Sequence, residues 1–383
     1  MAASTSTTVP TLLAKDYLPV PINDEERAAF VALEPAGFTI RHPPAPHDLD
    51  TFITPDDKLF QTIHIGAAVV DPSKWHLVIT GLVEHPFALN LEQLRTMPRH
   101  TITAFHECYG SPLKPATEAL WRIGNVQWTG VPLAYLLGLA SPLTNASHIW
   151  SEGLDRGSFA GVNADRYQKD LPIAKAFSSE VLVAYEINGR PLGKERGGPV
   201  RLVVPGWFGT NSTKWLSKLT VQDCRAMGPF TTVLYNEVDP EGPEGSMRPV
   251  WQVEINSMIT RPGTGVIVEG PEVLIEGWGW DAEPVECVDV SVDGGETWEA
   301  ARVEPRVDMS WQRFLLRLNL QPRRYTAIAR ATSADGKVQP FKGRRNHCHS
   351  VSFEIVPLDD LSSICTKRIT SCKPDLLSAD PIA

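Results

Sequence analysis

The sequence predicts an α+β fold in which a mixed α/β domain is followed by an all-β sandwich. Three observations support this. With 383 residues, the chain is too long for one ordinary core and suits two domains. Short strand and helix patterns alternate between residues 75 and 217, whereas from about residue 250 only short strands follow one another, separated by glycine and proline.

We divide the chain into four segments on this basis. Residues 1–50 carry seven prolines between Pro10 and Pro46 and are expected to form an irregular N-terminal arm. Residues 51–245 form the mixed domain, and residues 246–357 form the sandwich. The polar residues 358–383 are expected to form a flexible tail.

Composition and charge exclude several classes of protein. The formal net charge of −9 argues against nucleic-acid binding, which needs a basic face. No apolar run approaches the roughly 20 residues that span a bilayer, so no membrane segment is expected. The N-terminus lacks the pattern of a secretory signal, and the six cysteines include no C-x-x-C pair. We therefore expect an intracellular, cytoplasmic protein with reduced thiols.

The first domain is predicted from periodicity and from turn residues. Strands are expected at 75–83, 101–107 and 181–185, and short helices at 89–97, 133–139 and 172–177. Asn188-Gly189 predicts a hairpin turn. In the second domain we expect strands at 266–268, 273–276, 288–292, 314–318 and 325–329.

Cys108 ends the predicted strand 101–107 and is followed by Gly110, Ser111 and Pro112. At such a turn the thiol can point into a cleft and take part in chemistry. The alternative is a cysteine buried as a small hydrophobe, which is the commoner fate of an isolated cysteine. The remainder of the chain favours the first interpretation.

The segment 190–206 is unusually basic for an acidic protein. Arg190, Lys194, Arg196 and Arg201 are opposed only by Glu195, and the segment leads through glycines into a strand. Clustered basic side chains beside flexible backbone can bind a phosphate with guanidinium and amide groups together. The alternative is a solvated basic loop.

Several separated segments together resemble the sulfite oxidase family of molybdenum-cofactor proteins over most of residues 50–355. They are 52–55 with Phe60 and His64, Cys108, 121–136, 152–155, 188–192, 198–206, 212–216 and 288–298. The Pro205-Gly206-Trp207 sequence and the Gly130-Val131-Pro132-Leu133 sequence are closer to the bacterial sulfite and sulfane dehydrogenase branch.

The resemblance implies a molybdopterin-binding domain followed by an immunoglobulin-like domain that forms a homodimer. It implies one molybdenum-molybdopterin cofactor (Moco), whose metal takes a single protein ligand at Cys108. A polarizable thiolate suits such a soft metal environment. Further cofactor-binding positions are matched by Phe60, His64, Asp155, Arg201, Ser212, Thr213 and Lys214, and by Arg196, where the family often has histidine.

Two aromatic residues match catalytic positions that line the family's substrate cavity, Tyr235 and Trp121. The spacing around Trp121 fits less well. Tyr235 has an alternative interpretation as an aromatic residue in a core, because aromatic side chains mostly supply buried area.

The chain departs from family members that oxidise sulfite at two arginine positions, which are Thr62 and Leu113 here. Each lost charge-assisted contact typically contributes about 1.5–3 kcal/mol, so a small dianion would bind poorly. Lys114 or Arg122 would have to substitute from different places. We therefore predict that the small substrate is not sulfite.

The electron acceptor is left open by the sequence. A haem domain would need about a hundred further residues with two axial histidines, so we expect no haem and electron transfer to oxygen, a separate redox protein or a small acceptor. His347-Cys348-His349 is not predicted to bind metal, because alternation on a strand would place Cys348 opposite both histidines.

The preferred function is oxygen-atom transfer between water and a small substrate by a molybdenum-dependent oxidoreductase. Two alternatives remain at this stage. The chain could keep the fold but lack a redox role and act as an interaction module, or it could perform non-redox chemistry. Cys108 together with Arg201, Ser212 and Lys214 argues against an interaction module, which needs neither a thiol nor a phosphate site.

Overall fold

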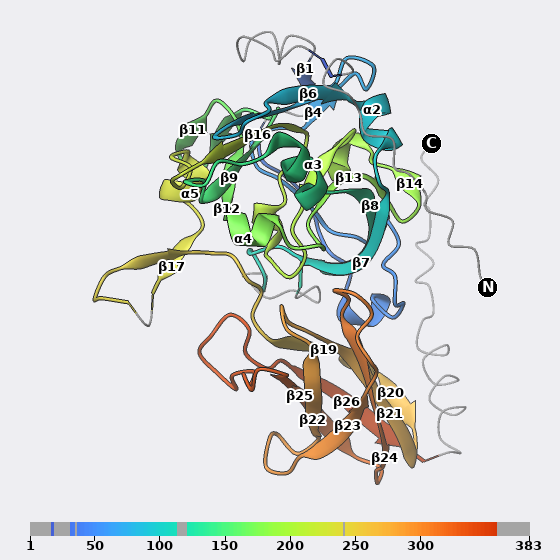
Figure 1. Cartoon of the computed structure of the whole chain (residues 1–383). Coiled ribbons are helices and arrows are strands. Elements are labelled where there is room, and N and C mark those ends of the chain that lie inside the picture. Colours follow the sequence, from blue (N-terminus) through green and yellow to red (C-terminus); the bar gives the residue numbers. More distant parts are fainter. Residues whose placement is uncertain (1–16, 19–30, 35–36, 113–120, 240–241, 358–383) are drawn as a thin grey trace, which may run out of the picture.

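The computed structural model of the chain describes residues 17–18, 31–34, 37–112, 121–239 and 242–357. Figure 1 places the first domain, coloured blue to yellow, above the second domain, coloured orange to red. Among the described residues, no helix has the length and apolar character needed to cross a membrane. The tail 358–383 and most of the predicted N-terminal arm lie outside the described residues.

Two five-stranded sheets build the first domain. The first has the order β12-β9-β16-β5-β6, in which only the pair β16 and β5 is parallel. Its strands are β5 (His76–Gly81), β6 (Phe87–Asn90), β9 (His148–Gly153), β12 (Gln168–Pro172) and β16 (Leu216–Gln222). The second has the order β14-β13-β8-β7, with β15 also paired to β13. Its strands are β7 (His100–Glu107), β8 (Ile123–Pro132), β13 (Leu182–Ile187), β14 (Arg190–Pro191) and β15 (Arg201–Val203).

Short helices and two-stranded pairs complete the first domain. The α-helices are α2 (Leu91–Thr96), α3 (Leu133–Ala140), α4 (Ile173–Ala176) and α5 (Pro229–Thr232), and the 3-10 helices are η2 (Pro46–Asp48), η3 (Lys194–Arg196) and η4 (Gly209–Asn211). The pairs are β1 (Val31–Leu33) with β4 (Ala68–Val70), β2 (Thr39–Arg41) with β3 (Gln61–Ile63), β10 (Gly157–Phe159) with β11 (Val162–Ala164), and β17 (Asn236–Val238) with β18 (Met247–Pro249).

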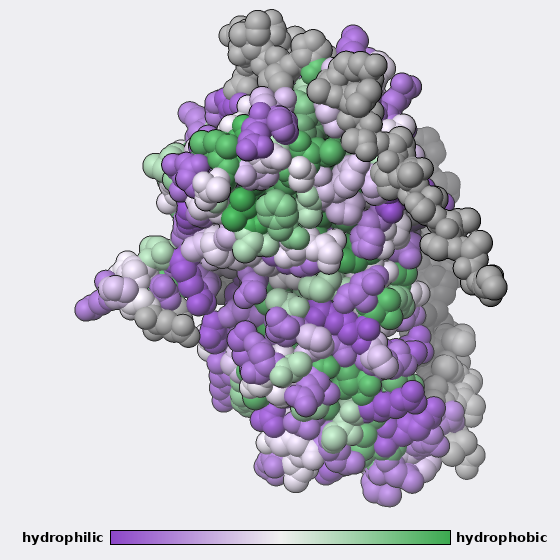
Figure 2. Space-filling view, viewed as in Figure 1, coloured by the Kyte–Doolittle hydropathy of each residue, from purple (hydrophilic) through white to green (hydrophobic). Residues whose placement is uncertain are grey.

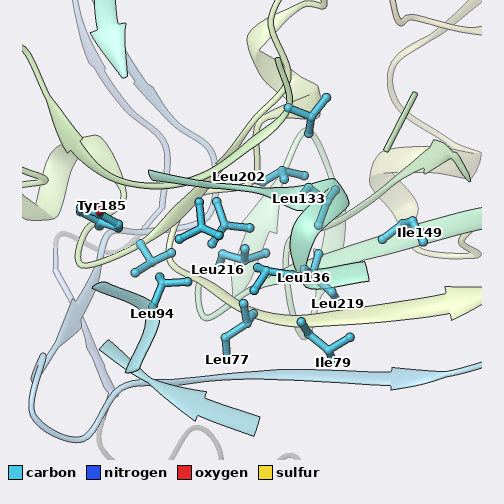
Figure 3. Packing of buried hydrophobic residues seen from close by; sticks show 14 of the residues in the cluster. Leu77, Ile79, Leu94, Leu133, Leu136, Ile149, Tyr185, Leu202, Leu216 and Leu219 are labelled. Carbon is cyan, nitrogen blue, oxygen red and sulfur yellow. The ribbon is translucent and has the colours of Figure 1, made fainter. Parts of the chain in front are cut away.

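Aliphatic side chains from strands and helices form the largest core, which lies in the first domain (Figure 3). Leu77 and Ile79 point the same way from β5 because side chains alternate along a strand. Leu133 and Leu136 lie on one face of α3 because residues three apart are neighbours on a helix. The same core includes Leu202 of β15, so it packs the first sheet and α3 against the strand that carries Arg201.

Eight strands form the second domain in the order β19-β21-β24-β23-β22-β25-β26-β20. They are β19 (Asn256–Arg261), β20 (Ile267–Glu269), β21 (Glu272–Trp280), β22 (Val285–Ser291), β23 (Glu299–Val303), β24 (Gln312–Asn319), β25 (Arg324–Ser333) and β26 (Ser350–Val356). A separate core between them includes Ile275, Val288 and Phe314.

The predicted elements are confirmed in large part. The predicted strands and helices of the first domain all form, with ends shifted by a few residues, and Asn188 and Gly189 adopt positive φ in the β13–β14 hairpin. The helices are short, however, so strands dominate the mixed domain more than the predicted α+β fold indicates. Within the predicted N-terminal arm, 31–33 and 39–41 form β1 and β2, which pair with β4 and β3.

A third core joins the two domains. Leu49, Phe105, Trp121, Ile123 and Phe208 of the first domain pack with Val250, Val253, Met258, Trp278, Trp280 and Trp311 that follow. The second domain also pairs directly with the edge strand β7. The Phe105 amide donates to the Met309 carbonyl at 3.0 Å, and the Met309 amide donates to the Thr103 carbonyl at 3.0 Å. The strand that leads to Cys108 is therefore held from both domains.

Candidate cofactor site

Cys108 follows the last residue of β7 and lines a pocket, which we call the Cys108 pocket. The Ser111 amide donates to the Cys108 carbonyl at 3.1 Å, which forms the predicted turn. The sulfur accepts the Gly110 amide N–H at 3.4 Å and lies 3.8 Å from Thr62 Oγ1. Cys108 is half-buried, so its thiol is available to a ligand in the pocket. The pocket is lined by Leu59, Phe60, Gln61, Thr62, His64, His106, Cys108, Tyr109, Trp128, Arg196, Arg201, Gly209, Thr210, Lys214 and Tyr235.

Arg201 lies on β15 and is almost completely buried. Its guanidinium group donates to the carbonyls of Arg196 at 3.1 Å and Ser212 at 3.0 Å, and lies 4.9 Å from the ring centre of Trp128. Burial lowers the pKa of Arg201 to about 9, because the charged form loses its hydration. Backbone carbonyl dipoles and the Trp128 ring, rather than a carboxylate, stabilise the positive charge of Arg201.

Lys214 brings a half-buried amine to the same pocket. Its Nζ donates to the carbonyls of Thr62 at 3.1 Å and Glu195 at 2.9 Å. Burial, with Arg201 and Arg196 nearby, lowers the pKa of Lys214 well below its usual range. Within the described parts of the chain, neither Arg201 nor Lys214 forms an ion pair. A buried guanidinium group and a half-buried amine, neither with a carboxylate partner, make the pocket suitable for an anion, which would stabilise their charged forms.

Arg196 also lines the pocket, but most of its donors are already used. The guanidinium group donates to a carboxylate oxygen of Asp56 at 2.7 Å and to the backbone carbonyls of Asp56, Leu59 and Phe60 at 2.7–3.0 Å. Its first role is therefore to hold residues 56–60 against η3. This segment precedes β3 and Thr62, so Arg196 shapes the pocket wall.

His64 and Tyr235 both line the Cys108 pocket and contact each other. The Tyr235 hydroxyl oxygen lies 2.6 Å from His64 Nε2. Burial lowers the pKa of His64 to about 3 and, together with the nearby Cys108 sulfur, raises the pKa of Tyr235 well above its usual value. Both groups are therefore neutral near pH 7, and Tyr235 keeps a proton at the pocket.

Asp155 and Ser212 line an adjoining pocket that shares Thr62, His64, Gly209 and Lys214 with the Cys108 pocket. Burial raises the pKa of Asp155 to about 7. Its Oδ1 is buried and accepts no hydrogen bond from the described residues. An unpaired buried acceptor of this kind is suited to an N–H donor of a ligand.

Thr213 and Trp121 lie outside both pockets. The Thr213 hydroxyl is fully buried and lies 2.7 Å from Ser151 Oγ, behind the site. Trp121 was predicted to line the substrate cavity, but the structure places it elsewhere. Its ring packs at 5.9 Å from Trp280 and at 4.7 Å from His349, in the core between the domains. The large apolar indole is buried there, so Trp121 does not reach the pocket.

His106 and Trp128 are pocket residues that the sequence analysis missed. His106 stacks on Phe60 at 5.7 Å and meets Trp128 edge to face at 5.7 Å. His106 lies two residues before Cys108, so strand alternation puts both on one face and was a usable signal. Trp128 comes from β8, and no pattern in its own segment links it to the site.

The positions at which the sequence departs from the sulfite-oxidising members of the family lie only in part within the described residues. Thr62 lies in the pocket beside the Cys108 sulfur. Leu113 and Lys114 lie outside the described residues. Arg122 donates from Nη1 to the Gly110 carbonyl at 3.2 Å, on the turn that follows Cys108.

His347, Cys348 and His349 precede β26 rather than lying on a strand, so the predicted alternation does not apply to them. The two imidazole rings lie 4.5 Å apart, whereas Cys348 is buried and its amide donates to the Pro340 carbonyl. Among the described residues, no group of three or more His, Cys, Asp or Glu side chains is arranged to hold a metal ion.

The donor set fits the cofactor that the sequence suggested. Cys108 offers one thiolate to a soft metal, Arg201 and Lys214 offer an anion site, and Asp155 Oδ1 offers a free acceptor to a pterin N–H. Backbone also approaches closely at Gly209, where a Cβ atom would lie 3.0 Å from the His106 ring. A side chain at this position would displace His106, which lines the Cys108 pocket.

Two family models match the chain. Residues 64–230 match "Oxidoreductase molybdopterin binding domain", and residues 247–351 match "Mo-co oxidoreductase dimerisation domain". Mitochondrial sulfite oxidase of Mus musculus is 30% identical over 352 residues, covering 82% of this chain and 64% of that protein. Sulfite oxidase of Gallus gallus is 31% identical over 283 residues, covering 68% of this chain and 61% of that protein. The chain therefore spans less than two thirds of the length of these relatives.

A solved structure gives the same result. The sulfane dehydrogenase SoxCD from Paracoccus pantotrophus matches with a TM-score of 0.71 and 27% identity, covering 92% of this chain and 93% of that chain. The two matched domains, the relatives and this structural neighbour agree with one another. The chain belongs to the sulfite oxidase family of molybdenum-cofactor oxidoreductases.

Proposed function

We propose that the protein is a molybdenum-cofactor-dependent oxidoreductase that transfers an oxygen atom between water and a small substrate. One observation carries this proposal. Cys108 and the basic residues Arg201 and Lys214 line the same pocket, although Cys108 lies about a hundred residues from both in sequence. A thiol beside an anion site is what a metal held by an anionic pterin requires.

The cofactor, when bound, supplies the two-electron redox chemistry and the oxygen transfer, and the chain supplies position and charge. Cys108 would bind the metal. Arg201 and Lys214 would neutralise the phosphate, and Asp155 would accept from the pterin. Tyr235 would orient the substrate through its hydroxyl, which is protonated near pH 7, as for an ordinary tyrosine, and whose pKa is raised further by burial.

We further propose that sulfite is not the physiological substrate. Thr62 stands in the pocket where an arginine is expected, and a hydroxyl cannot form the bidentate, charge-assisted contacts of a guanidinium group. A sulfite turnover rate similar to that of sulfite oxidases, measured on purified protein, would overturn this part of the proposal.

The dimerisation domain supports a homodimer, and the immunoglobulin-like character of this domain stays a prediction. The electron acceptor is proposed to be oxygen, a separate redox protein or a small acceptor. The cytoplasmic location also stays a prediction.

Elemental analysis of the native protein, with fluorescence of its oxidised pterin, tests the cofactor directly. We expect stoichiometric molybdenum and pterin. The variant Cys108→Ala should remain folded and keep pterin through Arg201, Lys214 and Asp155, but it should have no turnover. Full activity of Cys108→Ala, or a native protein without molybdenum and pterin, would contradict the proposal.

A further inference from the structure

One buried lysine has no part in the function proposed above. Lys169 lies on β12, and its side chain is fully buried. Hydrophilic residues, purple in Figure 2, cover much of the surface of both domains, and lysine side chains usually lie there. Among the described residues Lys169 forms no ion pair, and the carboxylate of the neighbouring Asp170 pairs with Arg225 instead, at 3.0 Å. Other groups must therefore stabilise the charge of Lys169.

Two residues of the segment that follows β16 contact the Lys169 ammonium group. Its Nζ donates to the Phe230 carbonyl at 3.1 Å and lies 5.6 Å from the ring centre of Tyr235. Phe230 belongs to α5, which Figure 1 places beside β12. Burial lowers the pKa of Lys169 to about 8, although Asp170 opposes this shift, so the group is mostly protonated at pH 7. The Tyr235 ring therefore lies over a positive charge, which its π-electrons attract.

Tyr235 has a backbone conformation that residues other than glycine rarely adopt. Its φ is 59°, in the left-handed region. A residue keeps such a conformation only where its surroundings fix it. The Val250 amide donates to the Tyr235 carbonyl at 3.0 Å, and the Tyr235 hydroxyl oxygen lies 2.6 Å from His64 Nε2. Lys169 supplies a third contact, on the ring between these two ends.

Lys169 itself does not reach the cofactor site. Tyr235 and His64 line the Cys108 pocket, whereas Lys169 lines neither that pocket nor the adjoining one. Any effect of Lys169 on the site must therefore pass through Tyr235. A cation under the ring favours one ring orientation, and the hydroxyl follows because it is rigidly attached to the ring.

We propose that Lys169 is a positioning residue for Tyr235, whose ring it holds so that the hydroxyl points into the Cys108 pocket. This inference rests on the proposed function, in which the Tyr235 hydroxyl orients the substrate. The alternative is a structural role, in which Lys169 only donates a hydrogen bond to the Phe230 carbonyl. The two roles differ in what happens at the hydroxyl end of the Tyr235 ring when the charge is removed.

Nitrogen NMR of cofactor-free protein labelled with isotopic histidine reports on the Tyr235 hydroxyl without substrate or metal. The chain has 10 histidines, and the Nε2 resonance of His64 is identified by its loss in His64→Gln. This resonance depends on the hydrogen bond with Tyr235, so Tyr235→Phe gives its position without that bond. We expect Lys169→Met and Lys169→Gln both to move the resonance part of the way to that position.

Two comparisons separate positioning from a structural role. Lys169→Gln removes the charge but keeps an N–H donor for the Phe230 carbonyl, so a structural role alone predicts a wild-type resonance for this variant. Lys169→Met is also made in the Tyr235→Phe background, where positioning predicts no further shift because no hydroxyl remains. Circular dichroism confirms folding, and the Lys169→Gln comparison decides if Lys169→Met does not fold.

Lys175→Met is the matched control. Lys175 also donates to a backbone carbonyl, that of Pro205 at 3.2 Å, and also lies over an aromatic ring, 5.7 Å from the ring centre of Trp207. It lies outside both pockets. Removing this lysine should leave the His64 resonance unchanged.

The cofactor-loaded protein tests the consequence for the site. Tyr235 lies close enough to Cys108 for its sulfur to raise the pKa of the tyrosine. We therefore expect Lys169→Met to keep its molybdenum and pterin but to change the Mo(V) paramagnetic resonance spectrum, which reduction with dithionite generates without a substrate. In the Tyr235→Phe background the same substitution should not change the spectrum.

The proposal is overturned if both Lys169 variants keep the wild-type His64 resonance, or if Lys169→Met shifts it equally with and without the Tyr235 hydroxyl. An unchanged Mo(V) spectrum of loaded Lys169→Met also overturns it. A native protein without molybdenum contradicts the proposed function instead, and the His64 resonance then still decides whether Lys169 positions Tyr235.

Discussion

Arg196 and Arg201 are both buried at the Cys108 pocket, but only Arg196 has a carboxylate partner, Asp56. In cofactor-free protein, we expect Arg196→Met to lower the free energy of unfolding by about 2–3 kcal/mol, mainly because it leaves three backbone carbonyls without their guanidinium donor; the ion pair adds little, since the Asp56 side chain is exposed. Arg201→Met should cost less than about 1.5 kcal/mol, because it also removes an unpaired buried charge. Urea unfolding of the two variants measures this difference.

The cofactor content should follow the opposite order. Arg201→Met should be purified with little pterin, whereas Arg196→Met should keep more of it whenever it folds. Pterin fluorescence of the purified variants provides this comparison. If Arg201→Met destabilises the protein as much as Arg196→Met and still retains full pterin, Arg201 has a structural role only.

Asp155 should make the stability of cofactor-free protein depend on pH. Its pKa is raised to about 7 in the folded protein. In the unfolded chain the pKa of an aspartate carboxyl is about 3.9. Between about pH 3.9 and 7 the folded state therefore binds more protons than the unfolded state, so the free energy of unfolding falls as the pH rises. Above about pH 7 we therefore expect Asp155→Asn to be more stable than the wild type by about 1–3 kcal/mol.

The difference between these two proteins isolates Asp155 from the other buried groups. Below about pH 4 it should vanish, because both side chains are then neutral. Chemical unfolding at a series of pH values measures it. A constant difference from pH 4 to 8 would show that the Asp155 carboxyl does not change its pKa on folding.

The site residues that could be predicted are those with a chemical signature in their own segment. Cys108 stood at a turn, and Arg201 lay in a basic stretch of an acidic chain, so their types alone indicated a thiol and an anion site. Lys214 lies outside that stretch and was identified only through the family resemblance. Trp121 had no such signature. Whether a tryptophan lines a cavity or a core depends on its neighbours in space, here Trp280 and His349.

At the scale of elements, the end of β7 is held by β21 of the second domain. The Trp280 indole N–H donates to the Glu107 carboxylate at 2.9 Å, and Glu107 directly precedes Cys108. The Arg345 guanidinium group donates to the Ser111 carbonyl at 3.1 Å on the other side of the turn. The turn that carries Cys108 is therefore fixed between two contacts from the second domain.

Removing one of these contacts should alter the position of the Cys108 sulfur. We expect Trp280→Phe, which deletes the indole N–H, to change the Mo(V) paramagnetic resonance spectrum and lower turnover about tenfold, as for a displaced metal ligand. Alkylation of Cys108 in cofactor-free protein, followed by mass spectrometry, should also become faster.

Trp278→Phe is the matched control. Trp278 lies in the same strand and core, but its indole N–H donates to the Leu49 carbonyl at 2.6 Å, away from Cys108. Both variants should lose similar stability. Equal spectra and equal alkylation rates for the two variants would show that the Trp280–Glu107 bond does not position Cys108.

Elements were predictable where local pattern and tertiary packing agreed. β5 alternates apolar and less apolar residues, and α3 places leucines at helical spacing, so both were found. β8 was not among the predicted strands, and its Gly124 and Gly130 are residues that weaken a strand pattern. The structure explains them: a Cβ at Gly130 would lie 2.2 Å from the Val183 carbonyl, and one at Gly124 would lie 2.5 Å from Leu59. These glycines are required by residues that lie close to them in space, and not by the local propensity of the segment.

At the scale of the whole molecule, the two domains share a core as well as a chain. Trp278 stacks on Trp311 at 4.6 Å, and the Trp311 indole N–H donates to the Phe52 carbonyl at 3.0 Å in the first domain. Phe105 and Ile123 of the first domain pack into the same cluster. Separation of the domains would expose this cluster to water, at a cost of about 25 cal/mol for each Å² of apolar surface.

The two domains should consequently unfold together. In scanning calorimetry of cofactor-free protein, we expect one transition, with a ratio of van't Hoff to calorimetric enthalpy of about 1. Phe314→Ala, which changes only the separate core of the second domain, should cost about 3–5 kcal/mol and should lower the unfolding temperature of the first domain equally. Hydrogen exchange of the amides of β9 and β16 reports on the first domain in this variant. Two resolved transitions, or unchanged exchange in β9 and β16, would mean that the aromatic cluster does not couple the domains. The second domain, which fixes the Cys108 turn, could then unfold while the first domain stays folded.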